Sequence, residues 1–233
     1  MSIILSIDTS STDLGIGIYK DGQAAVSMSR FIPNSHAEHI AQGVKMVLQL
    51  NKITAEEITH VGITTGPGSF TGLRIGISFV KGFCLGSKKP VAPFSSLFVL
   101  ANTFKAKKGT KIFSAIDARR DEIFWASFLS NGDGTVTRLS PDTISHIDSM
   151  LVAASDPQDI IITDTMGYSR STIFKILESN PNHFPVETYP VHRGLSVSQA
   201  AYNIIDEEDS WVSASVLEPE YLRLSSAQIK AAG

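Results

Sequence analysis

The chain of 233 residues is 42% hydrophobic and 18% charged, a balance that excludes a disordered or fibrous protein and favours one or two globular domains. Twenty basic and 23 acidic side chains give a formal net charge of −3, so a protein that binds nucleic acid through a broad basic field is also excluded. No uncharged apolar run approaches the roughly 20 residues of a membrane-spanning helix, so no membrane contact is expected.

The first half of the chain is predicted to hold three strands, a helix, a strand and a second helix. A nearly continuous apolar run that ends at Asp8 is typical of a strand buried on both faces. The Asp21-Gly22 pair predicts a hairpin, and apolar residues at helical spacing follow it. The expected elements are strands at 3–8, 14–18 and 24–30, a helix at 36–50, a strand at 60–65 and a helix at 70–86.

The same order of elements recurs from residue 111, where another apolar strand again ends in an Ile-Asp pair, at Asp117. A second hairpin signal, Asp133-Gly134, follows as in the first half. This recurrence indicates two copies of one unit rather than a short solenoid repeat. The expected elements are strands at 111–117, 122–130 and 135–139, a helix at 145–153, a strand at 159–163, a helix at 171–179, a strand at 186–191 and a helix at 197–205.

A three-strand meander followed by alternating helix and strand is the order of a ribonuclease-H-like unit. We therefore predict an α/β protein with the actin-like (ASKHA) fold, made of two ribonuclease-H-like domains in tandem. The basic, polar stretch at 105–109 predicts the boundary between them. The expected domains are residues 1–104 and 110–224, followed by a flexible tail at 225–233.

The most unusual segment is glycine-rich and spans residues 66–76. It lacks the lysine of a phosphate-binding P-loop, and its glycine spacing does not match the dinucleotide-binding fingerprint. We interpret it as a tight turn in which Ser69 caps the following helix. Gly72 and Gly76 lie four residues apart on that helix, where glycine costs roughly 1 kcal/mol, so a close packing partner is expected for them.

The helices expected at 36–50 and 70–86 carry little charge, and each has apolar residues on two sides. A helix that is apolar on two sides is buried on two sides, so we predict that a protein partner covers the second side. The alternative is that the second domain covers it. The predicted partner-binding residues are His36, His39, Gly43, Met46, Leu50, Gly72, Arg74, Ile75, Gly76 and Phe79.

Two acids at strand ends, Asp8 and Asp117, are expected to face the cleft between the domains, where nucleotide lies in actin-like proteins. Actin-like ATPases keep magnesium-binding acids there, and Thr9 and Ser10 would then lie beside the nucleotide. The alternative is that both acids only cap turns.

Three further features have a structural and a functional interpretation. His36 and His39 share a helix face, as a metal-binding pair would, but no third metal ligand is evident and histidine is ordinary at the start of a helix. Cys84, the only cysteine, is expected to be a buried, inert thiol, and its isolation favours a reducing, cytoplasmic compartment. Arg119 and Arg120 lie in a turn of alternating charge, where they either form surface ion pairs or meet an anionic partner such as tRNA.

Four motifs together resemble the bacterial TsaB (YeaZ) family: Ile7-Asp8-Thr9-Ser10, the block from Gly66 to Gly76, Asp117-Ala118-Arg119-Arg120, and Pro219-Glu220-Tyr221-Leu222-Arg223. The resemblance spans nearly the whole chain. It implies an actin-like fold and membership of the machinery that makes threonylcarbamoyladenosine at position 37 of tRNA. The implied partners are the catalytic paralogue TsaD and the ATPase TsaE, with tRNA bound through the complex.

The resemblance also implies that this chain is not itself an enzyme. TsaD binds its metal through a His-x-x-x-His pair, and Ser96 and Leu100 fall at the matching positions here. Neither residue can replace an imidazole ligand. We therefore expect no cofactor on this chain alone, ATP or ADP and a metal only in the complex, and a homodimer without the paralogue. The alternative is a stand-alone actin-like ATPase or a metallopeptidase.

Overall fold

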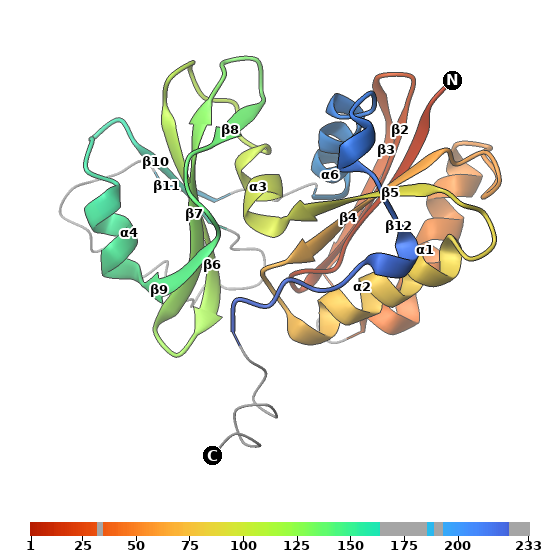
Figure 1. The fold of residues 1–233 in the computed structure, drawn as a ribbon, viewed down its shortest axis with the longest axis horizontal. Helices are drawn as coiled ribbons and strands as arrows, with labels where there is room; N and C mark the ends of the chain where they lie inside the picture. Colours follow the sequence, from red (N-terminus) through yellow and green to blue (C-terminus); the bar gives the residue numbers. More distant parts are fainter. Residues whose placement is uncertain (32–34, 164–185, 189–192, 224–233) are drawn as a thin grey trace.

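The computed structural model describes residues 1–31, 35–163, 186–188 and 193–223. Two β-sheets stand side by side in it, each with helices on its faces, and helix α3 (Ser96–Ala101) lies between them (Figure 1). The helix expected at 171–179 and the tail at 225–233 fall outside the described residues. No helix in the described ranges is both long enough and apolar enough to cross a membrane.

The first sheet has the strand order β12-β5-β4-β1-β2-β3. Its central strand β1 pairs antiparallel with β2 and parallel with β4, and every β1 residue is buried. Ile3, Leu5 and Ile7 share one hydrophobic cluster with α1 and α2, whereas Ile4 packs on the other side with α6. The elements are β1 (Ile3–Asp8), β2 (Asp13–Lys20), β3 (Gln23–Phe31), α1 (His36–Leu50), β4 (His60–Gly66), α2 (Phe70–Phe83), β5 (Pro90–Ser95), α6 (Arg193–Asn203) and β12 (Val212–Ser213).

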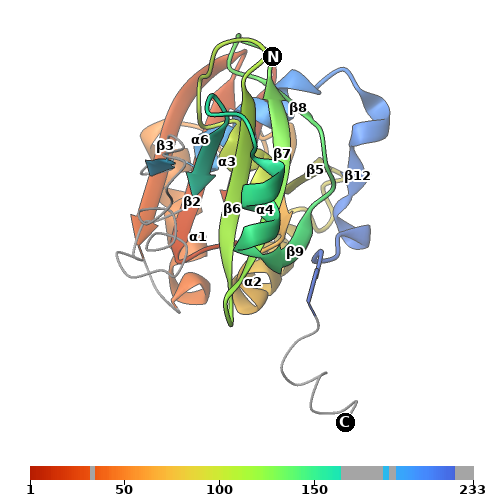
Figure 2. The same ribbon diagram turned by 90° about the vertical axis from the view of Figure 1, so that its left-hand side faces the viewer.

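The second sheet repeats this plan with the order β11-β10-β6-β7-β8, and β9 also pairs with β7. Its central strand β6 is antiparallel to β7 and parallel to β10, as β1 is to β2 and β4. Helix α4 covers the outer face of this sheet (Figure 2). The elements are β6 (Lys111–Arg119), β7 (Glu122–Ser130), β8 (Val136–Arg138), β9 (Thr143–His146), α4 (Ile147–Ala153), β10 (Ile160–Thr163) and β11 (Val186–Thr188). The predicted duplication and the actin-like fold class are confirmed.

The C-terminal part of the chain differs from the expected domain division, because it returns to the first sheet. Helix α6 packs on β1, β2 and β4, and β12 extends the first sheet beside β5. The contact of α6 with β2 is so close that a Cβ on Gly194 would lie 2.4 Å from the carbonyl carbon of Ile16. A Cβ on Gly17 would lie 2.6 Å from the Gly194 oxygen. Residues 193–213 therefore pack with the first unit, although we expected them in the second.

The final described segment, residues 217–223, runs along α2 and reaches the second sheet; we call it the C-terminal strap. Glu220 donates its backbone N–H to the Thr65 oxygen (2.8 Å). At its end, Arg223 donates to the Ala118 oxygen (2.7 Å) and forms an ion pair with Glu122. The strap, which contains the Pro219–Arg223 motif, thus connects the two units. Two 3₁₀ helices precede it, Glu208–Ser210 and Ala214–Val216.

His60 on β4 predicts one pH effect on stability. Its ring packs against the Trp211 ring with centroids 4.6 Å apart, and burial lowers its pKa from the ordinary value of 6.5. Between pH 6.5 and the lower folded-state pKa, the unfolded chain binds this proton more readily, so the free energy of unfolding falls as pH falls. We expect His60→Gln to lose less stability than the wild type between pH 7.5 and 5.5 in urea denaturation. Equal losses would contradict this assignment.

Candidate functional site

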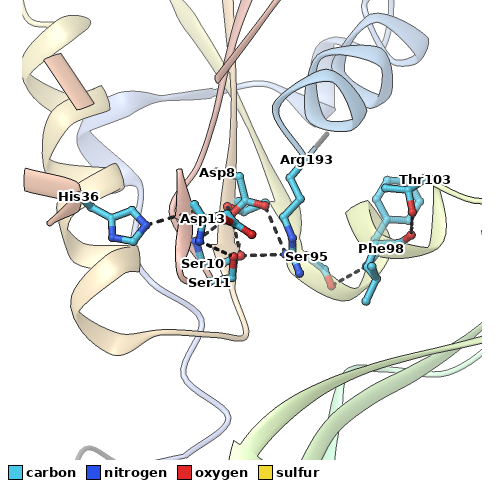
Figure 3. A network of polar contacts seen from close by, with 11 residues as sticks. Asp8, Ser10, Ser11, Asp13, His36, Ser95, Phe98, Thr103 and Arg193 are labelled. Carbon is cyan, nitrogen blue, oxygen red and sulfur yellow. Dashed lines mark hydrogen bonds and ion pairs between the residues drawn. The ribbon is translucent and has the colours of Figure 1, made fainter. Parts of the chain in front are cut away.

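The end of β1 places Asp8 at the centre of a buried polar network (Figure 3). Its side chain is fully buried, and Oδ1 accepts hydrogen bonds from the Ser10 backbone N–H (2.7 Å), Ser10 Oγ (2.6 Å) and Thr64 Oγ1 (2.9 Å). The other oxygen, Oδ2, lies 3.4 Å from Nη1 of Arg193, the first residue of α6. The same Nη1 donates to Ser10 Oγ (3.1 Å).

This network does not fit the magnesium site expected for an actin-like ATPase. A buried carboxylate needs hydrogen bonds and an opposite charge, and Ser10, Thr64 and Arg193 supply both to Asp8. Thr9, also buried, donates its hydroxyl to the Gly72 oxygen (2.8 Å). In this arrangement Asp8 has a guanidinium where a metal ion would have to bind. The expectation of an open nucleotide site around Asp8, Thr9 and Ser10 therefore disagrees with the structure.

Asp117, the other candidate acid, caps a turn. Its Oδ1 accepts the backbone N–H of Arg119 (2.6 Å) at the β6–β7 hairpin. Arg119 and Arg120 are exposed there and have φ values of 64° and 57°. The turn-capping alternative accounts for Asp117.

The glycine-rich segment packs against the chain's own β1–β2 turn. Ser69 caps α2 as expected, because its Oγ accepts the Gly72 N–H (3.2 Å). A Cβ on Gly72 would lie 2.0 Å from the Thr9 oxygen, and one on Gly76 would lie 2.3 Å from Thr9 Oγ1. Gly72 and Gly76 are buried in this contact, so the prediction that they contact a partner is wrong. Their close packing partner is Thr9.

Two of the predicted partner-binding residues on α1 also face inward. His36 is 4% exposed, and its Nε2 lies 3.3 Å from the Asp13 oxygen. A Cβ on Gly43 would meet the Met28 Cε of β3 at 2.6 Å. His39 is half-buried, whereas Met46 and Leu50 are 49% and 67% exposed. His36 and Gly43 therefore cannot contact a partner directly.

An open groove of about 590 Å³ lies between α1 and α2. Arg74 stands in it with its guanidinium 3.9 Å from the Phe70 ring centroid, and its Nε donates to the Tyr221 hydroxyl of the C-terminal strap (2.9 Å). Most of the other lining side chains are apolar or small. The groove is lined by Ala37, Ile40, Phe70, Thr71, Arg74, Ile75, Ser78 and Phe79, and we call it the α1–α2 groove.

The groove contains three of the predicted residues, Arg74, Ile75 and Phe79, but none of those predicted on α1. Successive helix residues are rotated by about 100°, so Met46 points roughly opposite to Ala37, nine positions earlier. Met46 and Leu50 therefore lie along the edge of α1 that is away from α2. The signal that could have separated these two edges is the three-residue spacing of Ala37 and Ile40, which places both on the α2 side of the helix.

The two positions that the resemblance led us to compare with the TsaD metal ligands lie in the hydrophobic interior. Ser96 and Leu100 on α3 are fully buried, and Leu100 packs with Ile112 and Phe128 of the second sheet. Across the described ranges, no group of three or more His, Cys, Asp or Glu side chains is placed to hold a metal ion. Cys84 is also buried, and burial raises the pKa of its thiol, as an inert cysteine requires.

Comparison with known proteins assigns the family. A family model described as "TsaD: tRNA N6-adenosine threonylcarbamoyltransferase" matches residues 30–166, more than half of the chain. The Escherichia coli K12 tRNA threonylcarbamoyladenosine biosynthesis protein TsaB is 31% identical over 148 residues, which cover 60% of this chain and 64% of that protein. The Bacillus subtilis TsaB is 23% identical over 97% of this chain and 96% of its own length. The chain belongs to the TsaB (YeaZ) family.

Solved structures agree with this TsaB fold over nearly the whole chain. YeaZ from Pseudomonas aeruginosa superposes with a TM-score of 0.76 at 23% identity, covering 95% of this chain and all of that one. A second solved structure, described as an uncharacterized protein with similarity to peptidase YEAZ from Pseudomonas aeruginosa, superposes with a TM-score of 0.78 at 25% identity, covering 96% of this chain and all of that one. The sequence matches to Escherichia coli and two Buchnera TsaB proteins span about three fifths of those proteins' lengths.

Proposed function

We propose that this chain is a non-catalytic subunit of the complex that makes threonylcarbamoyladenosine in tRNA, and that it binds and activates a TsaD-like catalytic paralogue in the cytoplasm. The observation that carries the proposal is the α1–α2 groove. The groove is lined by the apolar side chains of Ile40, Phe70, Ile75 and Phe79. The two helices that form it, α1 and α2, carry few charged residues. A concave apolar surface of this kind is typical of a protein-binding site.

The kind of partner follows from the relation of this chain to TsaD. The TsaD family model matches residues 30–166, a range that contains α1 and α2, so a TsaD protein is expected to carry equivalent helices. Two related chains can pair through equivalent surfaces in a nearly twofold arrangement. We propose that α1 and α2 pack against their equivalents in the paralogue. Without the paralogue, two copies of this chain would pair through the same surface.

Two sets of residues support the non-catalytic role. Ser96 and Leu100 lie at the positions that we compare with the TsaD metal ligands, and Arg193 faces the Asp8 carboxylate. Neither set suits a divalent ion. We therefore propose that this chain holds no cofactor on its own, and that ATP or ADP and the metal belong to the complex. A TsaE-like ATPase would join that complex, and tRNA would bind to the assembly rather than to this chain alone.

Reconstitution tests the proposal. The purified chain is expected to co-elute with its TsaD-like paralogue in a one-to-one complex and to raise threonylcarbamoyl transfer to tRNA at least about tenfold over the paralogue alone. The chain alone is expected to have no transferase, ATPase or peptidase activity. Equal transfer with and without this chain would contradict the activating role, and ATP turnover by the isolated chain would favour the enzyme alternative.

A further inference from the structure

The contact between Asp8 and Arg193 joins two segments that are far apart in the sequence. Asp8 ends the central strand of the first sheet, and Arg193 begins α6, the helix that returns from the second half of the chain (Figure 3). Arg193 is 1% exposed and Asp8 is not exposed at all. An ion pair so completely removed from water is stable only when hydrogen bonds and the opposite charge compensate both groups for the lost water.

The Asp8 carboxylate is surrounded by the kinds of atoms that would complete a cation site. Ser10 and Thr64 place hydroxyl groups 2.6 and 2.9 Å from Asp8 Oδ1. Magnesium binds oxygen ligands, and carboxylates are its usual protein ligands. The positive charge at this point comes instead from the guanidinium of Arg193, which contacts both Asp8 Oδ2 and Ser10 Oγ.

The backbone is shaped to bring Arg193 to this position. Gly194 follows it directly and lies against β2, where the absence of side chains on Gly15 and Gly17 lets the start of α6 touch the strand. A Cβ on Gly15 would lie 2.8 Å from the Gly194 nitrogen. Three glycines on two separate segments therefore allow one close contact between α6 and β2. That contact places the Arg193 guanidinium within reach of Asp8.

We infer that Arg193 is a built-in counter-ion that takes the place of a metal ion at Asp8, locks α6 onto the β1–β2 turn, and excludes a magnesium-bound nucleotide from Asp8. The inference does not depend on the proposed partner. It assigns a role to Arg193, for which sequence patterns offered none. It also implies that removing the guanidinium leaves a negatively charged, oxygen-lined site.

The test compares Arg193→Ala, Asp8→Asn and the double variant with the wild type, by thermal denaturation with and without millimolar MgCl2 or magnesium ATP. Arg193→Ala leaves a buried carboxylate without a counter-charge, so its midpoint is expected to fall by about 10 °C. Adding Asp8→Asn removes that charge and is expected to restore part of the loss. Mg²⁺ is expected to raise the midpoint of Arg193→Ala only.

The exposed Lys81–Glu218 ion pair (3.2 Å) provides a matched control. Lys81→Ala is expected to change the midpoint little and to create no response to Mg²⁺, because surface pairs contribute little. Three results would each overturn the inference. In the first, magnesium ATP raises the wild-type midpoint; in the second, the midpoint of the double variant falls by as much as the two single variants' losses added together. In the third, the midpoint of Arg193→Ala does not depend on Mg²⁺. If Arg193→Ala does not fold, a folded double variant supports the inference and an unfolded one contradicts it.

Discussion

Ser78→Arg is expected to lower the affinity for the TsaD-like paralogue at least about 100-fold while leaving the isolated chain as stable as the wild type. Ser78 is exposed and lies in the lining of the α1–α2 groove. A guanidinium at this position would project into an apolar contact, where an unpaired charge is costly and about 2.7 kcal/mol corresponds to 100-fold. Size-exclusion co-elution and isothermal titration calorimetry measure the loss.

Ser149→Arg is the matched control for this substitution. Ser149 is an exposed serine on α4, in the second unit, so the chemical change is the same but the groove is untouched. Its complex is expected to form normally. Leu50→Asp tests the other edge of α1, where the expected effect is smaller because Leu50 lies outside the groove. Unchanged affinity in Ser78→Arg, or an equal loss in Ser149→Arg, would contradict the assigned surface.

Gly72→Ala is expected to destabilise the isolated chain by roughly 3 kcal/mol. Its added Cβ would lie 2.0 Å from the Thr9 backbone oxygen, a contact that only movement of α2 or the β1–β2 turn can relieve. Overpacking of a rigid backbone contact costs typically 1–3 kcal/mol, and this case involves main-chain atoms on both sides. Chemical denaturation of the purified variant measures the change.

Gly82→Ala, near the end of the same helix, is the control, and its expected change in stability has the opposite sign. Apart from neighbouring residues and the backbone of its own helix, no atom lies within 4 Å of a Cβ on Gly82, so alanine meets no obstacle there. Because alanine favours helix over glycine by up to about 1 kcal/mol, the variant is expected to be slightly more stable than the wild type. Equal stability of Gly72→Ala and Gly82→Ala would contradict the close contact between α2 and Thr9.

The duplicated fold was predictable because its evidence is local. Apolar runs ending in Ile-Asp at Asp8 and Asp117 mark the two central strands, and both strands occupy the middle of their sheets. The cap at Ser69 was predictable for the same reason, since a capping side chain contacts its own helix. These features depend on residues that are close in sequence.

The errors share a different cause, because they depend on contacts between distant segments. Four-residue spacing shows that Gly72 and Gly76 share a helix face, but not that this face meets Thr9 rather than a partner. Likewise, no local pattern marks Arg193 as the partner of Asp8, which precedes it by most of the chain. The alternating glycines at Gly15 and Gly17 were a usable signal, since glycine inside a strand often indicates the close approach of another backbone.

Hydrogen exchange of this chain, measured with and without the TsaD-like paralogue, tests the proposed docking surface most directly. Amides of α1 and α2 that border the α1–α2 groove are expected to gain protection of at least about tenfold on complex formation, because a docked helix pair opens less often. The outer helix α4 and the β6–β7 hairpin are expected to exchange as before. Protection confined to the second sheet, with α1 and α2 unchanged, would contradict the account.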